Sequence, residues 1–162
     1  MYRYFLYLSA AAVFIMIFFS QALNVSADEI SAGSAVLIES ATGDVISEKN
    51  AYEKRSMAST TKIMTTLLCL ESGGLDDSFM VDPDAIMVEG SSMGLVKGDI
   101  VTKRYLCYGM LLASGNDAAN AAAVRVGKSI KGFCTLMNEK AEQLGLTQTH
   151  FATPSGLDDE EH

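Results

Sequence analysis

The sequence predicts an α/β (α+β) chain in which a hairpin of two strands is followed by a helical lobe. Two short β-type runs flank a turn sequence early in the chain. Apolar residues then recur at helical spacing in four later segments, most of which end at glycine. Because two strands alone make a marginal sheet, we expect further strands or a covering helix to pack against them.

Residues 1–27 have the pattern of a secretory signal peptide. Arg3 is the only charged residue before Asp28, and the apolar stretch 4–19 leads to Val25-Ser26-Ala27, a small-residue pattern typical of a cleavage site. A retained anchor is the alternative, since the uncharged run is long enough to cross a bilayer core of ~30 Å. With either interpretation, residues 28–162 are expected to be one exported domain.

The chain is acidic, with a formal net charge of −8. Nucleic acids and anionic lipid surfaces are polyanions, so this balance argues against both as partners. Membrane association is expected only through an uncleaved N-terminus.

The cysteines and histidines show no pattern of a metal site or a disulfide framework. Cys69, Cys107 and Cys134 are widely spaced within apolar helical patterns, which favours small buried hydrophobes over a disulfide. His150 and His162 have no companions at ligand spacing, so no metal is expected.

The first elements are a hairpin and a long apolar helix. Strands are predicted over 34–39 and 44–48, around the turn Ala41-Thr42-Gly43. A helix is predicted over 58–72 and stops at Gly73-Gly74. Apolar residues occur on all sides of this helix, which predicts that it is buried. Ile63, Leu67 and Leu70 form one stripe, with Met64 and Leu68 beside it.

The remaining segments are predicted as one irregular stretch and three helices. Residues 76–99 carry several Gly, Pro and Asp turn signals and are predicted to be irregular. Thr102 is the predicted N-cap of a helix through Ala113, with apolar positions at Leu106, Met110 and Leu111. Two further helices follow, each ending at a glycine: 118–126, capped by Asn116 or Asp117, and 131–144, which buries Phe133, Met137 and Leu144.

Ser59 and Lys62 are the first pair that carries chemistry. Three positions apart on a helix, their side chains share one face. A serine hydroxyl becomes a good nucleophile when a neighbour takes its proton, and a lysine amine does this when its pKa is lowered. The alternative is an ordinary helix start in which Ser59 caps and Lys62 is solvated.

Ser114-Gly115-Asn116 is the second chemical motif, and it lies at a break between two predicted helices. Such a break projects short polar side chains into a cleft, where a hydroxyl can relay a proton and an amide can donate to a carbonyl. The alternative is a simple turn with an asparagine cap. Both motifs in this order are more specific than either one alone.

Ser-x-x-Lys at 59–62, followed by Ser-x-Asn at 114–116, resembles the motifs of penicillin-binding proteins and class A β-lactamases. With the segments 89–95 and 151–157, these two motifs look like the serine-type D-alanyl-D-alanine carboxypeptidases, the low-molecular-mass penicillin-binding proteins of the β-lactamase/transpeptidase-like superfamily. The similarity runs from about Ala32 to the last residue. It implies that residues 28–162 are part of a catalytic domain with a sheet, a helical lobe and an active site between them.

The resemblance also implies roles for four residues. Ser59 would attack the bond between the terminal D-alanines of a peptidoglycan stem peptide and form an acyl-enzyme that water hydrolyses. Lys62 would be the general base, Ser114 the proton shuttle and Asn116 a substrate-orienting donor. β-Lactams would acylate Ser59 covalently, and neither a metal nor an organic cofactor would be needed. Lysine or glutamate as the base is disputed in the related β-lactamases, and no segment here resembles their deacylating glutamate.

One motif of this family, Lys-Thr-Gly, does not occur in the 162 residues. In the family it lies on a strand opposite the nucleophile, beside a donor of the oxyanion hole, and one such donor is worth ~10²–10³ in kcat. We therefore expect either the N-terminal portion of a carboxypeptidase, weakly active or inactive alone, or an inactive remnant or penicillin-binding module. A membrane-anchored helical protein with accidental motifs is a third alternative. Without the remaining strands, apolar faces at Ile63, Leu67 and Leu70 should be exposed.

Overall fold

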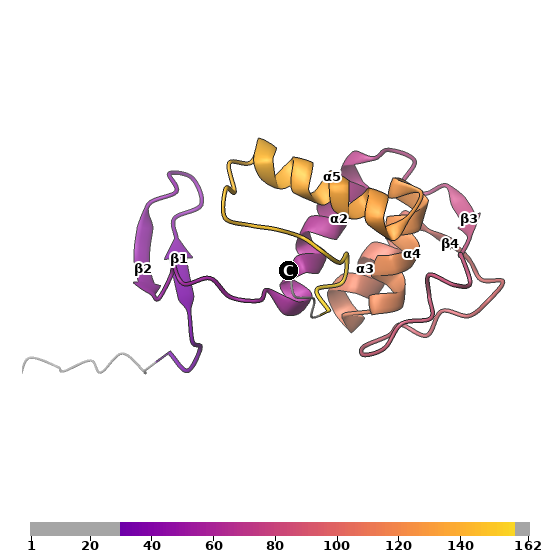
Figure 1. Cartoon of the computed structure of the whole chain (residues 1–162), viewed down its shortest axis with the longest axis horizontal. Coiled ribbons are helices and arrows are strands. Elements are labelled where there is room, and N and C mark those ends of the chain that lie inside the picture. The colour runs from indigo at the N-terminus through magenta and orange to yellow at the C-terminus, as the bar shows by residue number, and fades with distance from the viewer. Residues whose placement is uncertain (1–29, 158–162) are drawn as a thin grey trace, which may run out of the picture. The chain divides into compact units, whose positions relative to one another are not determined.

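The computed structural model describes residues 30–157, which form two compact units. The first unit, described here from residue 30 to Glu53, contains the hairpin, and the second, from Lys54 to residue 157, contains all the helices. The predicted signal peptide, residues 1–27, lies outside the described residues. Figure 1 labels the elements in chain order.

The first unit is an antiparallel hairpin of β1 (Ala35–Ile38) and β2 (Val45–Lys49), which confirms the predicted strands and turn. The Glu39 carboxylate accepts hydrogen bonds from the backbone N–H groups of Ala41 and Thr42, at 2.9 and 2.7 Å, and so holds the turn. Five large apolar side chains of the two strands are more than half exposed: Val36, Leu37, Ile38, Val45 and Ile46. Residues 30–53 themselves provide no layer to cover them.

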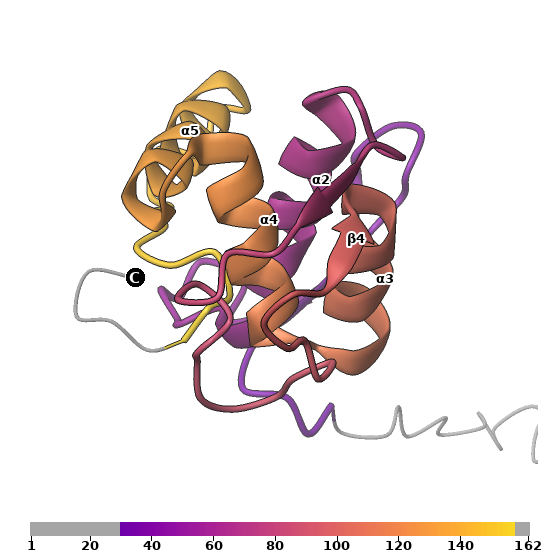
Figure 2. The same ribbon diagram turned by 90° about the vertical axis from the view of Figure 1, so that its right-hand side faces the viewer.

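The second unit is a helical lobe built around α4 (Asn116–Gly127). This helix contacts α2 (Thr61–Glu71), α3 (Lys103–Ala113) and α5 (Ile130–Gln143), and lies between α5 and α3 in Figure 2. Its alanines permit the close approach that the sequence predicts, since five of them are at most 2% exposed: Ala118, Ala119, Ala121, Ala122 and Ala123. A short 3₁₀ turn, η1 (Ala58–Thr60), leads into α2.

A second strand pair interrupts the segment that was predicted to be irregular. β3 (Ser78–Met80) pairs antiparallel with β4 (Ile100–Thr102), and Phe79 lies opposite Val101. The prediction of irregular structure over the whole of 76–99 is therefore wrong at β3. Strands of three residues are too short for an alternating pattern to be recognised in the sequence.

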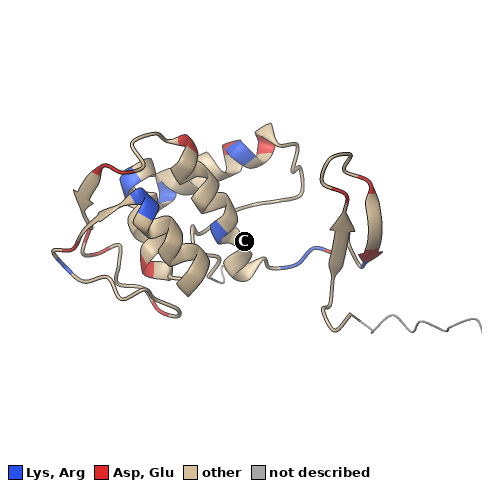
Figure 3. Cartoon of the chain, turned by 180° about the vertical axis from the view of Figure 1, so that it is seen from behind, with Lys and Arg blue, Asp and Glu red and all other residues tan. Residues whose placement is uncertain are grey.

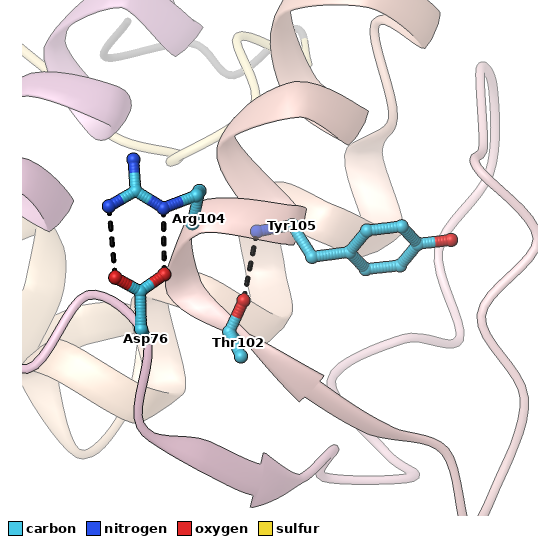
Figure 4. A network of polar contacts seen from close by, with 4 residues as sticks. All are labelled: Asp76, Thr102, Arg104 and Tyr105. Carbon is cyan, nitrogen blue, oxygen red and sulfur yellow. Dashed lines mark hydrogen bonds and ion pairs between the residues drawn. The ribbon is translucent and has the colours of Figure 1, made fainter.

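Thr102 caps α3 as predicted. Its Oγ1 accepts a hydrogen bond from the N–H of Tyr105 at 3.1 Å (Figure 4). Two residues beyond Thr102, Arg104 binds Asp76 through two hydrogen bonds of 2.7 and 2.9 Å, and this guanidinium holds the pKa of Asp76 below its usual range. The pair ties the loop after α2 to the first turn of α3.

The start of α4 differs from the prediction. The helix begins at Asn116, two residues earlier than expected, and its N-cap is Gly115, which has no side chain to offer. The prediction that Asn116 or Asp117 caps the helix is wrong, because both side chains form hydrogen bonds with the loop 89–95, between β3 and β4, instead. The next helix, α5, begins at Ile130 and is capped by Ser129, whose Oγ accepts from the N–H of Gly132.

The predicted burial of apolar side chains is confirmed at some positions of the helices and wrong at others. Phe133 and Met137 are fully buried, as predicted, whereas Leu144 is 54% exposed because α5 has ended before it. On α2, Ile63 and Leu70 are 65% and 53% exposed, so the prediction of burial on all sides is wrong and the predicted exposure of these two residues is confirmed. Leu67, which was predicted to be exposed with them, is partly buried and packs against the cluster around Phe133. The three cysteines are buried and none forms a disulfide, which confirms the hydrophobe interpretation.

Charged residues lie mainly in turns and at helix ends, while the long faces of the helices carry few (Figure 3). Within residues 30–157, no helix combines the length and apolar character that crossing a bilayer requires.

Phe133→Ala is expected to lower the free energy of unfolding by about 3–5 kcal/mol, because it empties a fully buried aromatic position that packs against α2 and α4. Leu144→Ala, the matched control at the exposed end of α5, should cost less than about 0.5 kcal/mol. Urea denaturation followed by circular dichroism measures both. Similar losses for the two variants would show that α5 is not anchored through Phe133.

Candidate active site

Ser59 lies in η1, immediately before α2, and is exposed to solvent. The preceding residue, Ala58, has a left-handed backbone conformation, with φ of 44°. Such strain in a residue other than glycine persists only where the surrounding structure enforces it. The turn thus presents the Ser59 hydroxyl at the positive end of α2, where the helix dipole favours negative charge on that oxygen.

Lys62 lies one turn further along and is buried, with 1% of its surface exposed. Its Nζ donates to Ser59 Oγ at 3.0 Å and to the backbone carbonyl of Ser155 at 2.8 Å. Burial lowers the pKa of the Lys62 ammonium below its ordinary value. The alternative of a capping Ser59 and a solvated Lys62 is therefore wrong, since neither helical segment has a side-chain cap at its start.

Ser114 contacts the same hydroxyl. It is the C-cap of α3 and has a left-handed backbone, with φ of 54°. This conformation turns its side chain out of the helix, and its Oγ donates to Ser59 Oγ at 2.9 Å. Ser59, Lys62 and Ser114 therefore meet at one oxygen although 55 residues separate the two serines.

Asn116 lies two residues beyond Ser114 and is 5% exposed. Its side-chain amide donates to the carbonyl of Glu89 at 2.8 Å, and its backbone N–H donates to the carbonyl of Ser91 at 2.7 Å. The loop between β3 and β4 therefore holds Asn116, and the described contacts include no hydrogen bond from its side chain to Ser59, Lys62 or Ser114.

The turn 153–157 is a part of the site whose role the sequence did not reveal. Its Ser155 carbonyl receives the Lys62 ammonium, and its Pro154 carbonyl accepts a hydrogen bond from Thr65 Oγ1 at 2.6 Å. Gly156, with φ of 77°, lies so close to Ala58 that an added Cβ would fall 1.8 Å from the Ala58 carbonyl oxygen. The segment 151–157 contributed to the family resemblance, but its contact with Lys62 could not be predicted, because backbone carbonyl groups carry no residue-specific pattern.

The arrangement can activate a serine. A hydroxyl placed between a buried amine of lowered pKa and a second hydroxyl can lose its proton to the amine, and the second hydroxyl can relay a proton. No group of three or more potential metal-ligating side chains occurs within the described part of the chain. The arrangement of Ser59, Lys62 and Ser114 is the one that an enzyme with a serine nucleophile requires.

The chain belongs to the D-alanyl-D-alanine carboxypeptidase family, whose family model matches residues 21–162. The D-alanyl-D-alanine carboxypeptidase DacF of Bacillus subtilis is 40% identical over 136 residues, which are 81% of this chain and 35% of DacF. The family binds D-Ala-D-Ala peptides and penicillins, is related to the cell wall and is typically extracytoplasmic.

Solved structures show the same fold over part of their length. The D-alanyl-D-alanine carboxypeptidase DacD from Francisella tularensis matches with a TM-score of 0.74 and 38% identity, over 82% of this chain and 33% of that one. Penicillin binding protein 6B from Escherichia coli matches with a TM-score of 0.73 and 38% identity, over 80% and 44%. The chain thus has the predicted penicillin-binding protein fold and spans between a third and a half of these relatives.

Two glycines of matched backbone conformation test how tightly the turn 153–157 fits against Ala58. Gly145→Ala should cost about 1–2 kcal/mol, the strain of a left-handed alanine, because φ there is 73° and no atom lies within 4 Å of the added Cβ. Gly156→Ala should cost about 1–3 kcal/mol more, because Ala58 must also move. Urea denaturation of both variants measures the difference, and equal losses would contradict the close approach.

Proposed function

We propose that this chain carries the nucleophilic half of a serine-type D-Ala-D-Ala carboxypeptidase of cell-wall biogenesis. Ser59 Oγ attacks the carbonyl carbon between the two terminal D-alanines of a peptidoglycan stem peptide. The terminal D-alanine leaves, an ester to Ser59 forms, and water hydrolyses that ester to free the shortened peptide and regenerate Ser59. The observation that carries the proposal is the double contact of Ser59 Oγ with Lys62 and Ser114.

Lys62 is the proposed general base. Its pKa is lowered by burial, so a larger share of the amine is neutral than at an exposed lysine, and the neutral nitrogen can accept the Ser59 proton over 3.0 Å. The hydrogen bond to the Ser155 carbonyl fixes the direction of the amine, which leaves its lone pair free for Ser59.

Ser114 is the proposed proton shuttle, and Asn116 the proposed substrate-orienting donor. Ser114 Oγ donates to Ser59 Oγ at 2.9 Å, so in this proposal the Ser114 hydroxyl gives its proton to the departing amine of D-alanine and is reprotonated by Lys62, which carries the proton taken from Ser59. An asparagine amide carries two N–H bonds. Since one hydrogen bond from the Asn116 amide goes to the Glu89 carbonyl, the second N–H is the one proposed to meet the substrate carbonyl.

The proposed setting is extracytoplasmic, after removal of residues 1–27, and β-lactams are the proposed covalent inhibitors because they present an acyl carbonyl to Ser59. None of these steps uses a metal or an organic cofactor.

A second candidate is a penicillin-binding module without turnover. This candidate concerns the 162 residues on their own, which contain no Lys-Thr-Gly, the motif that in the resemblance described above supplies a cation and lies beside an oxyanion donor. Acylation and turnover therefore have to be measured separately.

Labelled penicillin separates these candidates. The purified chain from Asp28 onward is expected to form a covalent adduct that is absent in Ser59→Ala, and to release little or no D-alanine from a D-Ala-D-Ala peptide. Thr60→Ala is the matched control, because the neighbouring Thr60 hydroxyl donates to the Met57 carbonyl and takes no part in the contacts of Lys62 or Ser114.

Retained labelling in Ser59→Ala would contradict the assignment of the nucleophile. A folded wild-type chain that stays unlabelled would favour the inactive remnant over both candidates.

The rate of acylation should rise with pH. The neutral form of Lys62 is the active one, and burial lowers its pKa, so the rate should increase through a midpoint below the ordinary lysine value of about 10.4. Lys62→Arg, whose side chain stays charged, should slow acylation by at least about 100-fold. Lys140→Arg is the control, since Lys140 pairs with Glu71 at the far end of α2. A rate that does not change with pH would exclude Lys62 as the base.

A further inference from the structure

Asp117 is the most heavily hydrogen-bonded carboxylate in the described part of the chain, and the proposed mechanism does not use it. It is 1% exposed. Its two oxygens accept from the Ser92 hydroxyl at 2.7 Å and from four backbone N–H groups at 2.9–3.0 Å, which belong to Met93, Gly94, Leu95 and Ala118. Four of these five donors come from one loop.

The same loop also holds Asn116. The carbonyl of Ser91 accepts from the Asn116 backbone N–H, and the carbonyl of Glu89 accepts from its side-chain amide. Residues 89–91 thus receive donors from Asn116, while residues 92–95 donate to Asp117. Two successive residues of α4 therefore hold the whole loop 89–95, and the loop in turn fixes the amide of Asn116.

The charge of Asp117 suits this arrangement. Burial raises the pKa of the Asp117 carboxyl, but the hydrogen bonds from Ser92, Leu95, Met93 and Ala118 outweigh burial and the net pKa is lowered. The carboxylate also lies in the first turn of α4, where the helix dipole favours a negative charge. An ionised carboxylate offers only acceptors, as five converging donors require.

Two glycines, Gly90 and Gly115, show how closely the loop 89–95 approaches the start of α4. A Cβ on Gly115, the middle residue of the Ser114-Gly115-Asn116 motif, would lie 2.8 Å from Asp117 Oδ1 and 3.1 Å from the N–H nitrogen of Met93. A Cβ on Gly90 would lie 2.7 Å from the side-chain nitrogen of Asn116. The two atoms that form the hydrogen bond between Met93 and Asp117 therefore lie next to Gly115, in the Ser114-Gly115-Asn116 motif.

We propose that Asp117 is a positioning residue, which binds the loop 89–95 to the start of α4 so that the Glu89 carbonyl orients the Asn116 amide toward the substrate. The proposal rests on the function proposed for this site. It differs from a role in stability alone, because the loop acts on one functional group, the amide of Asn116.

The test compares Asp117→Asn with Asp117→Glu and with Asp82→Asn. In Asp117→Asn, one of the oxygens becomes an NH₂ group that faces donors whichever way the amide is turned. Asp117→Glu restores the acceptor pair. Asp82 is a control from the same irregular segment, since its carboxylate accepts from the N–H groups of Asp84 and Ala85 at an exposed turn.

Two readouts are taken on the folded chain. The first is the ¹H–¹⁵N signal of the Asn116 side-chain amide together with hydrogen exchange at Met93, Gly94 and Leu95. The second is the rate of labelling by penicillin. Asp117→Asn should shift the Asn116 signal, speed exchange at these three amides at least tenfold and slow acylation at least tenfold. Asp117→Glu should recover part of each change, and Asp82→Asn should change neither readout.

Faster loop exchange in Asp117→Asn with an unchanged Asn116 signal would overturn the proposal, because the loop would then be held without orienting the amide. An acylation rate equal to that of the wild type would also overturn it. If the wild-type chain is never labelled, the proposed function fails, and the Asn116 signal alone decides whether Asp117 positions the amide.

Discussion

The burial of the Lys62 ammonium is the constraint on which the described site depends. A buried lysine needs hydrogen-bond partners in place of water, and here the partners are the Ser59 hydroxyl and the Ser155 carbonyl. One partner belongs to the turn before α2 and the other to a segment 93 residues further along the chain. Satisfying a single amine therefore fixes η1, α2 and the turn 153–157 with respect to one another.

The helical lobe provides the rigid support for this arrangement. α4 contacts α2, α3 and α5 through buried alanines, so the distance between the helix that carries Lys62 and the break that carries Ser114 is set by short side chains. Short side chains have few rotamers to change. The Ser59–Ser114 contact of 2.9 Å is a consequence of this packing rather than of any local sequence pattern.

Much of this lobe could be predicted because its signals are local. The cap at Thr102, the three-residue spacing of Ser59 and Lys62 and the apolar pattern that predicts burial of Phe133 are each signals from residues within two turns of each other. The family resemblance added the order of the motifs and, through it, the expectation that distant motifs meet.

Other parts could not be predicted, and each has a physical reason. β3 and β4 are too short to show alternation, and Leu144 continues the apolar pattern of α5 past the end of the helix. Asp117 looks like a helix cap in the sequence, and only the fold shows that its donors come from a loop more than 20 residues earlier. The Ser155 carbonyl could not be recognised at all, because every residue has such a group.

The close approach of Gly156 to Ala58 has a consequence for the order of folding. The contact joins residues near opposite ends of the helical unit, so it closes a long loop, and loop closure of this kind is slow compared with helix formation. During synthesis from the N-terminus, α2, α3 and α4 can pack before residue 156 exists. The amine of Lys62 then has no carbonyl from Ser155, and the contacts around Ser59 are completed only when the turn 153–157 docks. The reactivity proposed for Ser59 would therefore report completed folding of the lobe.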